Sequence, residues 1–157
     1  FDIDASMALL ERAAILGDAD AQLRYANESL RSTGGSISVA AEAARRKPLV
    51  RDMLAHSLKH GDWRALAVLG DMLSIGYFTD PDPAAAYAYF YAARQAPDAS
   101  GSRLPWASGP TLMFFGDAAA ELDADMARLA ARLTPEEITL AQGAGLALYT
   151  RCCMGKP

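Results

Sequence analysis

The sequence contains no apolar run long enough to cross a membrane. A transmembrane helix needs roughly 20 consecutive apolar residues, and the longest suggestive run, 138–150, is shorter and contains Gln142, Gly143 and Gly145. We therefore expect a soluble protein without membrane insertion. No signal peptide is visible, but the chain begins at Phe1 rather than Met. The compartment stays open, and an exported or periplasmic location follows if a signal sequence preceded Phe1.

Positive charge is also scarce. The chain has 15 Lys and Arg against 19 Asp and Glu, which gives a formal net charge of −4. Binding to nucleic acid needs a basic face, so we expect no nucleic-acid partner. The only basic cluster is Arg45-Arg46-Lys47, followed by Arg51. We interpret it as a solvated turn rather than as a contact for an acidic partner.

Cysteine is limited to one adjacent pair, Cys152 and Cys153. A disulfide framework needs separated pairs, and a vicinal disulfide is possible but strained. Neither a C-x-x-C spacing nor a nearby histidine supports a redox or metal role for the pair. We therefore predict two ordinary thiols, with an intermolecular disulfide in an oxidising compartment as the alternative.

Recognisable catalytic motifs are missing as well. The sequence has no G-x-S-x-G motif, no Walker motif and no Cys–His pair at a suggestive spacing. Gly143-x-Gly145 is not a phosphate loop, because it lies in an expected helix without a preceding strand. An apolar stripe passes between four neighbouring carboxylates, which we interpret as a solvated helix face: Asp117, Glu121, Asp123 and Asp125. The sequence predicts no catalytic residue, no enzymatic activity and no cofactor.

Histidine occurs only twice, at His56 and His60. Side chains four residues apart project from one helical face, which is the spacing of a two-histidine metal site, and Asp52 adds a carboxylate one turn earlier. A third well-placed ligand is not apparent. The alternative is that Lys59 and His60 simply occupy a last helical turn, where cations are favourable. We predict that the chain holds no metal.

The residues that are present favour helices. Alanine, the best helix former, is abundant, and β-branched residues are sparse between the loops. A length of 157 residues with 52% hydrophobic residues suits a single domain with its own core. The apolar periodicity predicts an all-α fold of about seven helices and no strand. The expected helices are 4–16, 19–31, 38–60, 62–75, 83–95, 111–133 and 135–152.

Proline and cap residues set several of the expected boundaries. Proline lacks an N–H and clashes with the preceding turn, so we expect Pro48 to divide the third segment, with a short helix ending at Arg46. Asp82 is the expected cap of the fifth helix. Thr134 and Glu137 are expected to form a capping box at the start of the last helix.

The one long loop is rich in Pro, Gly and Ser and contains Trp106. We expect this ring to anchor the loop on neighbouring helices rather than to contact a partner.

Two Gly-Asp segments, beginning at Gly17 and Gly61, are about 44 residues apart, a period in the helical-repeat range. In each, an apolar helical pattern ends at the glycine and a new one begins after the aspartate. Glycine can adopt the left-handed conformation that closes a helix, and aspartate can cap the next helix. Each segment therefore predicts a compact turn between antiparallel helices, and Gly76 ends the next helix in the same way.

One stretch carries a family pattern in two consecutive helices. Its residues are Gly61-Asp62-x-x-Ala65-x-x-x-Leu69-Gly70-x-Met72-Leu73-x-x-Gly76, followed by Ala85-x-x-x-Tyr89-x-x-Ala92-Ala93. This stretch resembles the Sel1-like repeat family of tetratricopeptide-like helical repeats. The earlier segment 17–32 resembles a second, degenerate first helix, because Tyr25 stands where leucine is expected and Ala26 where glycine is expected. The structural positions that the resemblance implies are Gly17, Ala21, Gly61, Ala65, Leu69, Gly70, Gly76, Ala92 and Ala93.

The resemblance also implies an overall layout. It predicts one helical-repeat domain over residues 1–157, arranged as an α/α superhelix of antiparallel hairpins. A Sel1-like repeat region spans 2–95, a long loop spans 96–110, and a helical pair spanning 111–153 caps the array.

Family members are often bacterial and are mostly adaptors or scaffolds, so the resemblance implies a protein or peptide partner bound in a concave groove. The first helix of each pair usually lines the concave side. This points to Arg24, Asn27, Glu28, Arg31, Arg64, Val68, Asp71 and Met72. Two alternatives stay open: an exported ligand- or metal-binding protein with a pocket between the third to sixth expected helices and the loop 97–110, and the capping end of a longer array. The sequence leaves the partner and the oligomeric state open.

Overall fold

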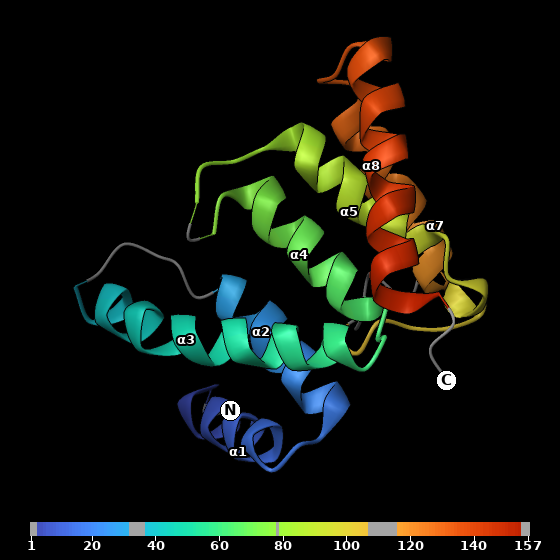
Figure 1. The fold of residues 1–157 in the computed structure, drawn as a ribbon. Helices are drawn as coiled ribbons and strands as arrows, with labels where there is room; N and C mark the ends of the chain where they lie inside the picture. The colour runs from blue at the N-terminus through green and yellow to red at the C-terminus, as the bar shows by residue number, and fades with distance from the viewer. Residues whose placement is uncertain (1–2, 32–36, 78, 107–115, 155–157) are drawn as a thin grey trace.

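The described part of the chain is all-helical, as expected. A computed structural model describes residues 3–31, 37–77, 79–106 and 116–154. Over these ranges it contains seven α-helices, one short 3-10 helix and no strand (Figure 1). The elements are α1 (Ile3–Ile15), α2 (Ala19–Arg31), α3 (Ile37–Lys59), α4 (Arg64–Ile75), α5 (Pro83–Arg94), η1 (Pro97–Ala99), α7 (Ala118–Ala130) and α8 (Pro135–Cys153). None of the described helices is long and apolar enough to cross a membrane.

The two Gly-Asp segments form matching turns. Gly17 and Gly61 have φ angles of 99° and 75°, in the left-handed region that glycine adopts freely. In both turns the aspartate N–H donates to the carbonyl five residues earlier, which closes the preceding helix. Asp18 then accepts a hydrogen bond from Ala21 N at 2.7 Å and caps α2. Asp62 accepts one from Arg64 N at 3.1 Å, so α4 begins two residues later than predicted.

The predicted caps of α5 and α8 are confirmed. Asp82 accepts a hydrogen bond from Ala85 N at 2.9 Å, with proline at the first helical position. Thr134 and Glu137 form a reciprocal capping box. Both signals lie within three residues of the helix start, so they depend on no distant part of the chain.

The predicted break at Pro48 is wrong. Helix α3 runs without interruption from Ile37 to Lys59, with Pro48 inside it. Pro48 and the residue one turn earlier, Ala44, are both exposed, so water can hydrate the carbonyl that has no N–H partner. After the proline, Val50 is fully buried and Met53 nearly so. Their packing holds the helix together across the missing hydrogen bond.

Helix α7 differs from the expected helix 111–133. It begins at Ala118 and ends at Ala130, and residues 111–115 lie outside the described residues. Gly116 has a φ of 74°, and the Asp117 side chain accepts a hydrogen bond from Ala120 N at 2.9 Å. A left-handed glycine followed by a capping aspartate therefore sets the start of the helix, by the same chemistry as at the two Gly-Asp turns.

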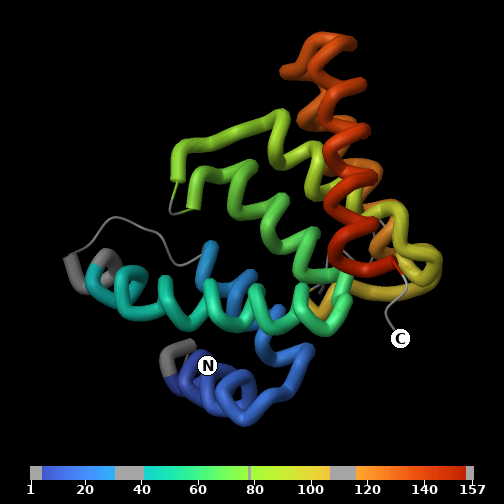
Figure 2. Tube along the Cα trace, viewed as in Figure 1, coloured from blue at the N-terminus to red at the C-terminus, as the bar shows by residue number. Residues whose placement is uncertain are grey.

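Helix α5 lies at the centre of the C-terminal half, where it packs against α4, α7 and α8 (Figure 1). Helices α1, α2 and α3 form the other half, and α2 and α3 contact α4 across the middle of the molecule (Figure 2). The largest fully buried side chains come from both halves and include Tyr25, Leu66, Phe90 and Leu122. Trp106 is also buried, which confirms its expected role as a loop anchor.

Small residues allow the central helices to approach closely. A Cβ on Gly70 of α4 would lie 2.7 Å from the Phe90 ring of α5, so the expected close approach at Gly70 is confirmed. Gly145 of α8 is as tightly placed, because its Cβ would lie 2.7 Å from the Ala88 carbonyl oxygen. The alanines at predicted structural positions are buried and Leu69 packs at the edge of the core; they are Ala21, Ala65, Ala92 and Ala93.

Candidate binding face and pocket

Helices α2 and α4 lie side by side and are joined by polar side chains at equivalent places in the two Gly-Asp segments. Arg64 Nη1 lies 2.6 Å from Asp20 Oδ1, and Asn27 Nδ2 donates to Asp71 Oδ2 at 3.2 Å. The two residues of each pair are 44 positions apart. The spacing noticed in the sequence is therefore also the spacing of residues that touch across the two helices.

Of the predicted concave-face positions, Asn27, Arg64 and Asp71 take part in these contacts. Arg24 is exposed, whereas Glu28, Arg64, Asp71 and Met72 are partly exposed. We define the α2–α4 face as the accessible residues Asp20, Arg24, Glu28, Arg64, Asp71 and Met72.

Two predicted positions do not belong to the face. Asn27 is 4% exposed and Val68 is fully buried, so neither is accessible to a partner. Asn27 contacts Asp71 across the two helices, and the repeat pattern did not distinguish covered positions from accessible ones. The side chain of Arg31 lies outside the described residues.

Arg64 is the most highly bonded residue of the face. Its guanidinium donates to both oxygens of Asp62, from Nε at 3.0 Å and from Nη2 at 2.9 Å, and its third nitrogen contacts Asp20. The hydrogen bonds to Asp62 raise the pKa of Arg64 above its usual value, so the group stays cationic. This geometry ties the α3–α4 turn to the start of α2 and fixes the direction of the arginine.

A surface pocket of about 380 Å³ opens beside Arg64. It lies between the α3–α4 turn and the segment that follows α5. Its lining carries two arginines and two aspartates, with an indole and a hydroxyl: Gly61, Asp62, Trp63, Arg64, Asp98, Ser102 and Arg103. This mixture of charges can hold a ligand that carries both a carboxylate and an ammonium group.

The loop side of the pocket is held in place by distant contacts. Asp117 accepts a hydrogen bond from Gly101 N at 2.9 Å, and Ala118 N donates to the Ser102 carbonyl at 2.8 Å. Leu104 and Trp106 are buried beneath the same segment. No sequence motif identifies Asp98, Ser102 or Arg103 as pocket residues, because the loop is recognisable only by its Pro, Gly and Ser content. The alternative hypothesis placed a ligand pocket between the third to sixth expected helices and the loop 97–110. The pocket beside Arg64 is lined by residues 61–64 and by Asp98, Ser102 and Arg103, and its use as a ligand site stays a prediction.

The basic cluster is not a solvated turn, and that interpretation was wrong. Arg45 Nη2 lies 2.7 Å from Glu11 and 2.7 Å from Glu42, and Arg46 is only 9% exposed. Tyr25 donates its hydroxyl to Glu11 at 2.6 Å. These hydrogen bonds join α1, α2 and α3.

The same contacts shift several pKa values in this cluster. Hydrogen bonds from Arg45 hold the pKa of Glu11 below its usual value and lower that of Glu42 to about 2. Burial, and then the Glu11 carboxylate, raise the pKa of Tyr25. The carboxylates are therefore charged and the tyrosine is neutral over the physiological range.

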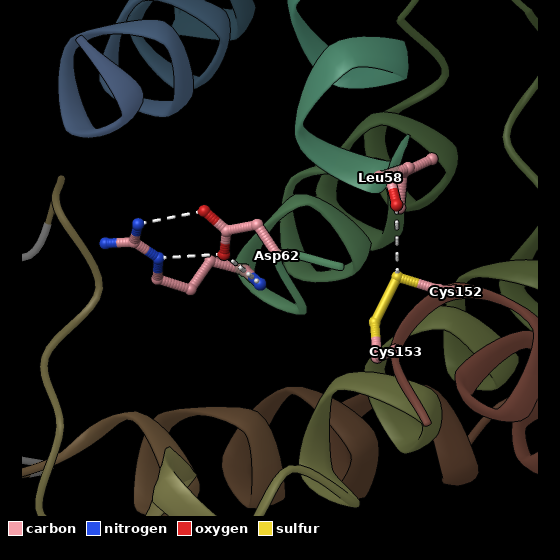
Figure 3. The surroundings of a disulfide bond; sticks show 5 residues. Leu58, Asp62, Cys152 and Cys153 are labelled. Carbon is pink, nitrogen blue, oxygen red and sulfur yellow. Dashed lines mark hydrogen bonds and ion pairs between the residues drawn. A yellow bond between two sulfur atoms is a disulfide. The ribbon is translucent and has the colours of Figure 1, made fainter. Parts of the chain in front are cut away.

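The adjacent cysteines are not two free thiols, which corrects the prediction. Cys152 and Cys153 form a disulfide in the last turn of α8 (Figure 3). Cys152 is buried, and its Sγ lies 3.9 Å from the carbonyl oxygen of Leu58 near the end of α3. The pair therefore sits where the last helix meets the α3–α4 turn.

The two histidines are close together at the end of α3. His60 Nε2 lies 3.0 Å from His56 Nε2, and His56 Nδ1 lies 3.3 Å from Gln22 Oε1. Asp52 does not join them, since nowhere in the described ranges do three potential metal-ligating side chains gather.

Comparison of the chain with protein-family models, curated proteins and solved structures finds no match. The similarity to Sel1-like repeats therefore remains a prediction based on the residues that carry it.

Proposed function

We propose that this protein is a non-catalytic scaffold that binds a protein or peptide segment along the α2–α4 face. The observation that carries the proposal is the paired contact between equivalent positions, Asp20 with Arg64 and Asn27 with Asp71. In stacked helical repeats, the first helices of successive hairpins lie side by side and present one continuous surface. The contacts between α2 and α4 support such an arrangement, including the α/α superhelix and the Sel1-like resemblance.

The chemistry of the face suits an extended peptide. Acidic and basic groups alternate along it, from Asp20 and Arg24 to Glu28, and Met72 adds a partly exposed apolar side chain. Peptide-binding surfaces combine polar groups that set the register with apolar contacts that supply binding energy. Arg24 has no ion-pair partner among the described residues, so its charge is available to an acidic group of the partner.

The pocket supports binding rather than catalysis. The described residues that line it include no histidine and no cysteine. Asp62 is already bound by both of its oxygens to Arg64. The pocket is therefore suited to receive one end or one side chain of the bound segment.

The test is a comparison of three baits in a pull-down: wild type, Arg24→Glu and Arg132→Glu. Arg132 is exposed on the C-terminal half, so its variant matches the charge change away from the face. We expect a partner that wild type and Arg132→Glu retain and that Arg24→Glu loses, with about tenfold weaker binding when the purified pair is measured. Equal retention by all three baits would remove the face from the proposal.

A second candidate is supported by the pocket alone: an exported protein that binds a small zwitterion. Arg64 and Arg103 would receive a carboxylate, and Asp98 would receive an ammonium group. The disulfide supports export, because disulfides persist in oxidising compartments. A thermal-shift titration with dialanine tests this function. It should stabilise wild type and Arg132→Ala but not Arg103→Ala, and an equal shift for all three proteins would reject the pocket as the site.

A further inference from the structure

The two histidines have a fixed geometry that neither the proposed face nor the pocket explains. His56 lies in the last turn of α3 and His60 one residue beyond its end, and both side chains are exposed. Their Nε2 atoms are 3.0 Å apart and their ring centroids 4.4 Å apart. The two ring nitrogens that face each other are thus at the surface and open to an ion from solvent.

Gln22 determines which nitrogen of His56 carries the proton. The Gln22 amide is buried, and its Nε2 donates to the Ala14 carbonyl at 3.0 Å. The amide oxygen must therefore be the atom that faces His56, and it accepts from His56 Nδ1 at 3.3 Å. With its proton on Nδ1, neutral His56 presents an unprotonated Nε2 to His60. An acceptor behind the ring is the usual support of a metal-binding histidine.

The separation of the two nitrogens fits one class of metal coordination. With metal–nitrogen bonds of about 2.05 Å, a nitrogen separation of 3.0 Å corresponds to an angle of about 95° at the metal. That angle is close to the right angle between neighbouring ligands in tetragonal Cu²⁺ and Ni²⁺ sites. It is smaller than the tetrahedral angle that structural Zn²⁺ sites adopt.

We propose that His56 and His60 form a surface chelate for a divalent transition-metal ion of the Cu²⁺ or Ni²⁺ class, with Gln22 as the positioning residue. Both Nε2 atoms bind the ion. Because His56 Nε2 carries no proton, the proton of the contact between the two rings is on His60 Nε2. When the ion binds, His60 loses this proton from Nε2 and takes one up on Nδ1, so the pair loses no net proton. The remaining coordination positions are filled by water or by a group of a second molecule. The site is independent of the proposed binding face, because it uses none of the residues of that face.

The site can be tested cleanly because these are the only histidines in the chain. Untagged protein would be titrated with NiCl₂ by calorimetry in a non-coordinating buffer without reductant, which keeps the cysteines joined and unable to bind metal. We expect one saturable site per chain. Each of His56→Ala and His60→Ala should weaken binding by more than about tenfold, since losing even an outer-sphere partner costs that much.

Asp52→Asn is the matched control. Asp52 is exposed one turn before His56 and does not gather with the pair, so this variant should bind Ni²⁺ within about twofold of wild type. With Cu²⁺, the electron paramagnetic resonance spectrum should show two bound nitrogens in wild type and one in His60→Ala. Absence of saturable binding by wild type would overturn the proposal. So would binding that His60→Ala leaves unchanged, or that Asp52→Asn weakens as much as the histidine variants do.

Discussion

A single carboxylate, Glu11, connects three helices. It accepts hydrogen bonds from Tyr25 of α2 and Arg45 of α3 while it belongs to α1 itself. Its side chain is only 19% exposed, so these bonds are less screened by solvent than those of an ordinary surface ion pair. Leaving such a group charged without partners would be costly.

This carboxylate should make stability depend on acid pH. The folded-state pKa of Glu11 lies below its unfolded value of 4.5, so its contribution is fully present above that value. The contribution is lost as pH falls through the lower, folded pKa. Glu42, with a pKa of about 2, acts in the same direction, although it is more exposed. We expect the free energy of unfolding to fall between pH 4.5 and about 2, and to fall less steeply in Glu11→Gln.

Urea unfolding at a series of pH values from 7 to 2.5 measures this slope. Glu136→Gln is the matched control, because Glu136 is exposed and has no ion pair among the described residues. Its slope should equal that of wild type. A Glu11→Gln protein with the wild-type slope would show that the three-helix contact does not contribute.

Residue-level prediction succeeded where the cause is local. The capping roles of Asp82 and Thr134 could be predicted because donor and acceptor are three residues apart. The role of Arg45 could not, because Glu11 is 34 residues away and nothing in the sequence links the two. The same limit applies to Arg103, whose place in the pocket depends on how the loop is held against α7.

At the scale of the helix, tertiary packing overrode a strong local signal. Helix α3 continues through Pro48 because the residues after the proline are buried against their neighbours. Propensity describes an isolated segment, and a packed helix can tolerate the loss of one hydrogen bond. The missing hydrogen bond at Pro48 nevertheless lowers the stability of the protein.

Replacing Pro48 by a residue with a backbone N–H should therefore raise the free energy of unfolding. Alanine is favoured over proline by about 3 kcal/mol inside a helix, less about 1 kcal/mol for the greater freedom of the unfolded chain. We expect Pro48→Ala to raise the free energy of urea unfolding by about 2 kcal/mol. Pro135→Ala is the control, since a proline in the first turn of α8 interrupts no hydrogen bond. A gain of similar size in both variants would contradict this explanation.

Two glycines in α8 provide a contrast within one helix. A Cβ on Gly145 would lie 2.7 Å from the Ala88 carbonyl, an atom of the α5 backbone that cannot easily move. Gly143 is exposed and has nothing within 4 Å. Gly145→Ala should therefore lower stability by about 1–3 kcal/mol. Gly143→Ala should raise it by up to about 1 kcal/mol, because alanine is the better helix former.

Thermal and urea unfolding of the two variants measure whether each substitution raises or lowers stability. Opposite signs are the expected result. If both substitutions stabilise the protein, α5 and α8 do not pack as closely as the structure places them.

At the scale of the whole molecule, two groups of helices meet along a polar contact. The sequence predicted the number and most boundaries of the helices, because apolar periodicity and capping residues are local features that can be recognised in a sequence. The concave-face role of Arg24, Glu28, Arg64, Asp71 and Met72 stays a prediction, because the structure shows only that these residues are accessible. The sequence did not show that Val68 is covered, since one helix pattern does not reveal which side its neighbour occupies.

Arg64 is central to the contact between the two halves, so a substitution at this residue should lower the stability of the whole protein. Lysine keeps the charge but cannot make the two parallel hydrogen bonds to Asp62 and reach Asp20 as well. We expect Arg64→Lys to lower the free energy of unfolding by about 1–2 kcal/mol. Arg132→Lys, which changes an exposed arginine, should stay within about 0.5 kcal/mol. Equal changes in the free energy of unfolding would mean that the three hydrogen bonds of Arg64 do not stabilise the contact between the two halves.

The bond between Cys152 and Cys153 joins neighbours, so it closes almost no loop and removes little freedom from the unfolded chain. Its making or breaking therefore changes the loop-closure entropy of the chain very little. What changes is the chemistry at the end of α8, from two sulfurs without a proton to two thiols, one of them facing the Leu58 carbonyl. These are the only cysteines in the chain. A count of free thiols in the monomer therefore gives either zero or two. This number reports whether the protein has been exposed to oxidising or reducing conditions.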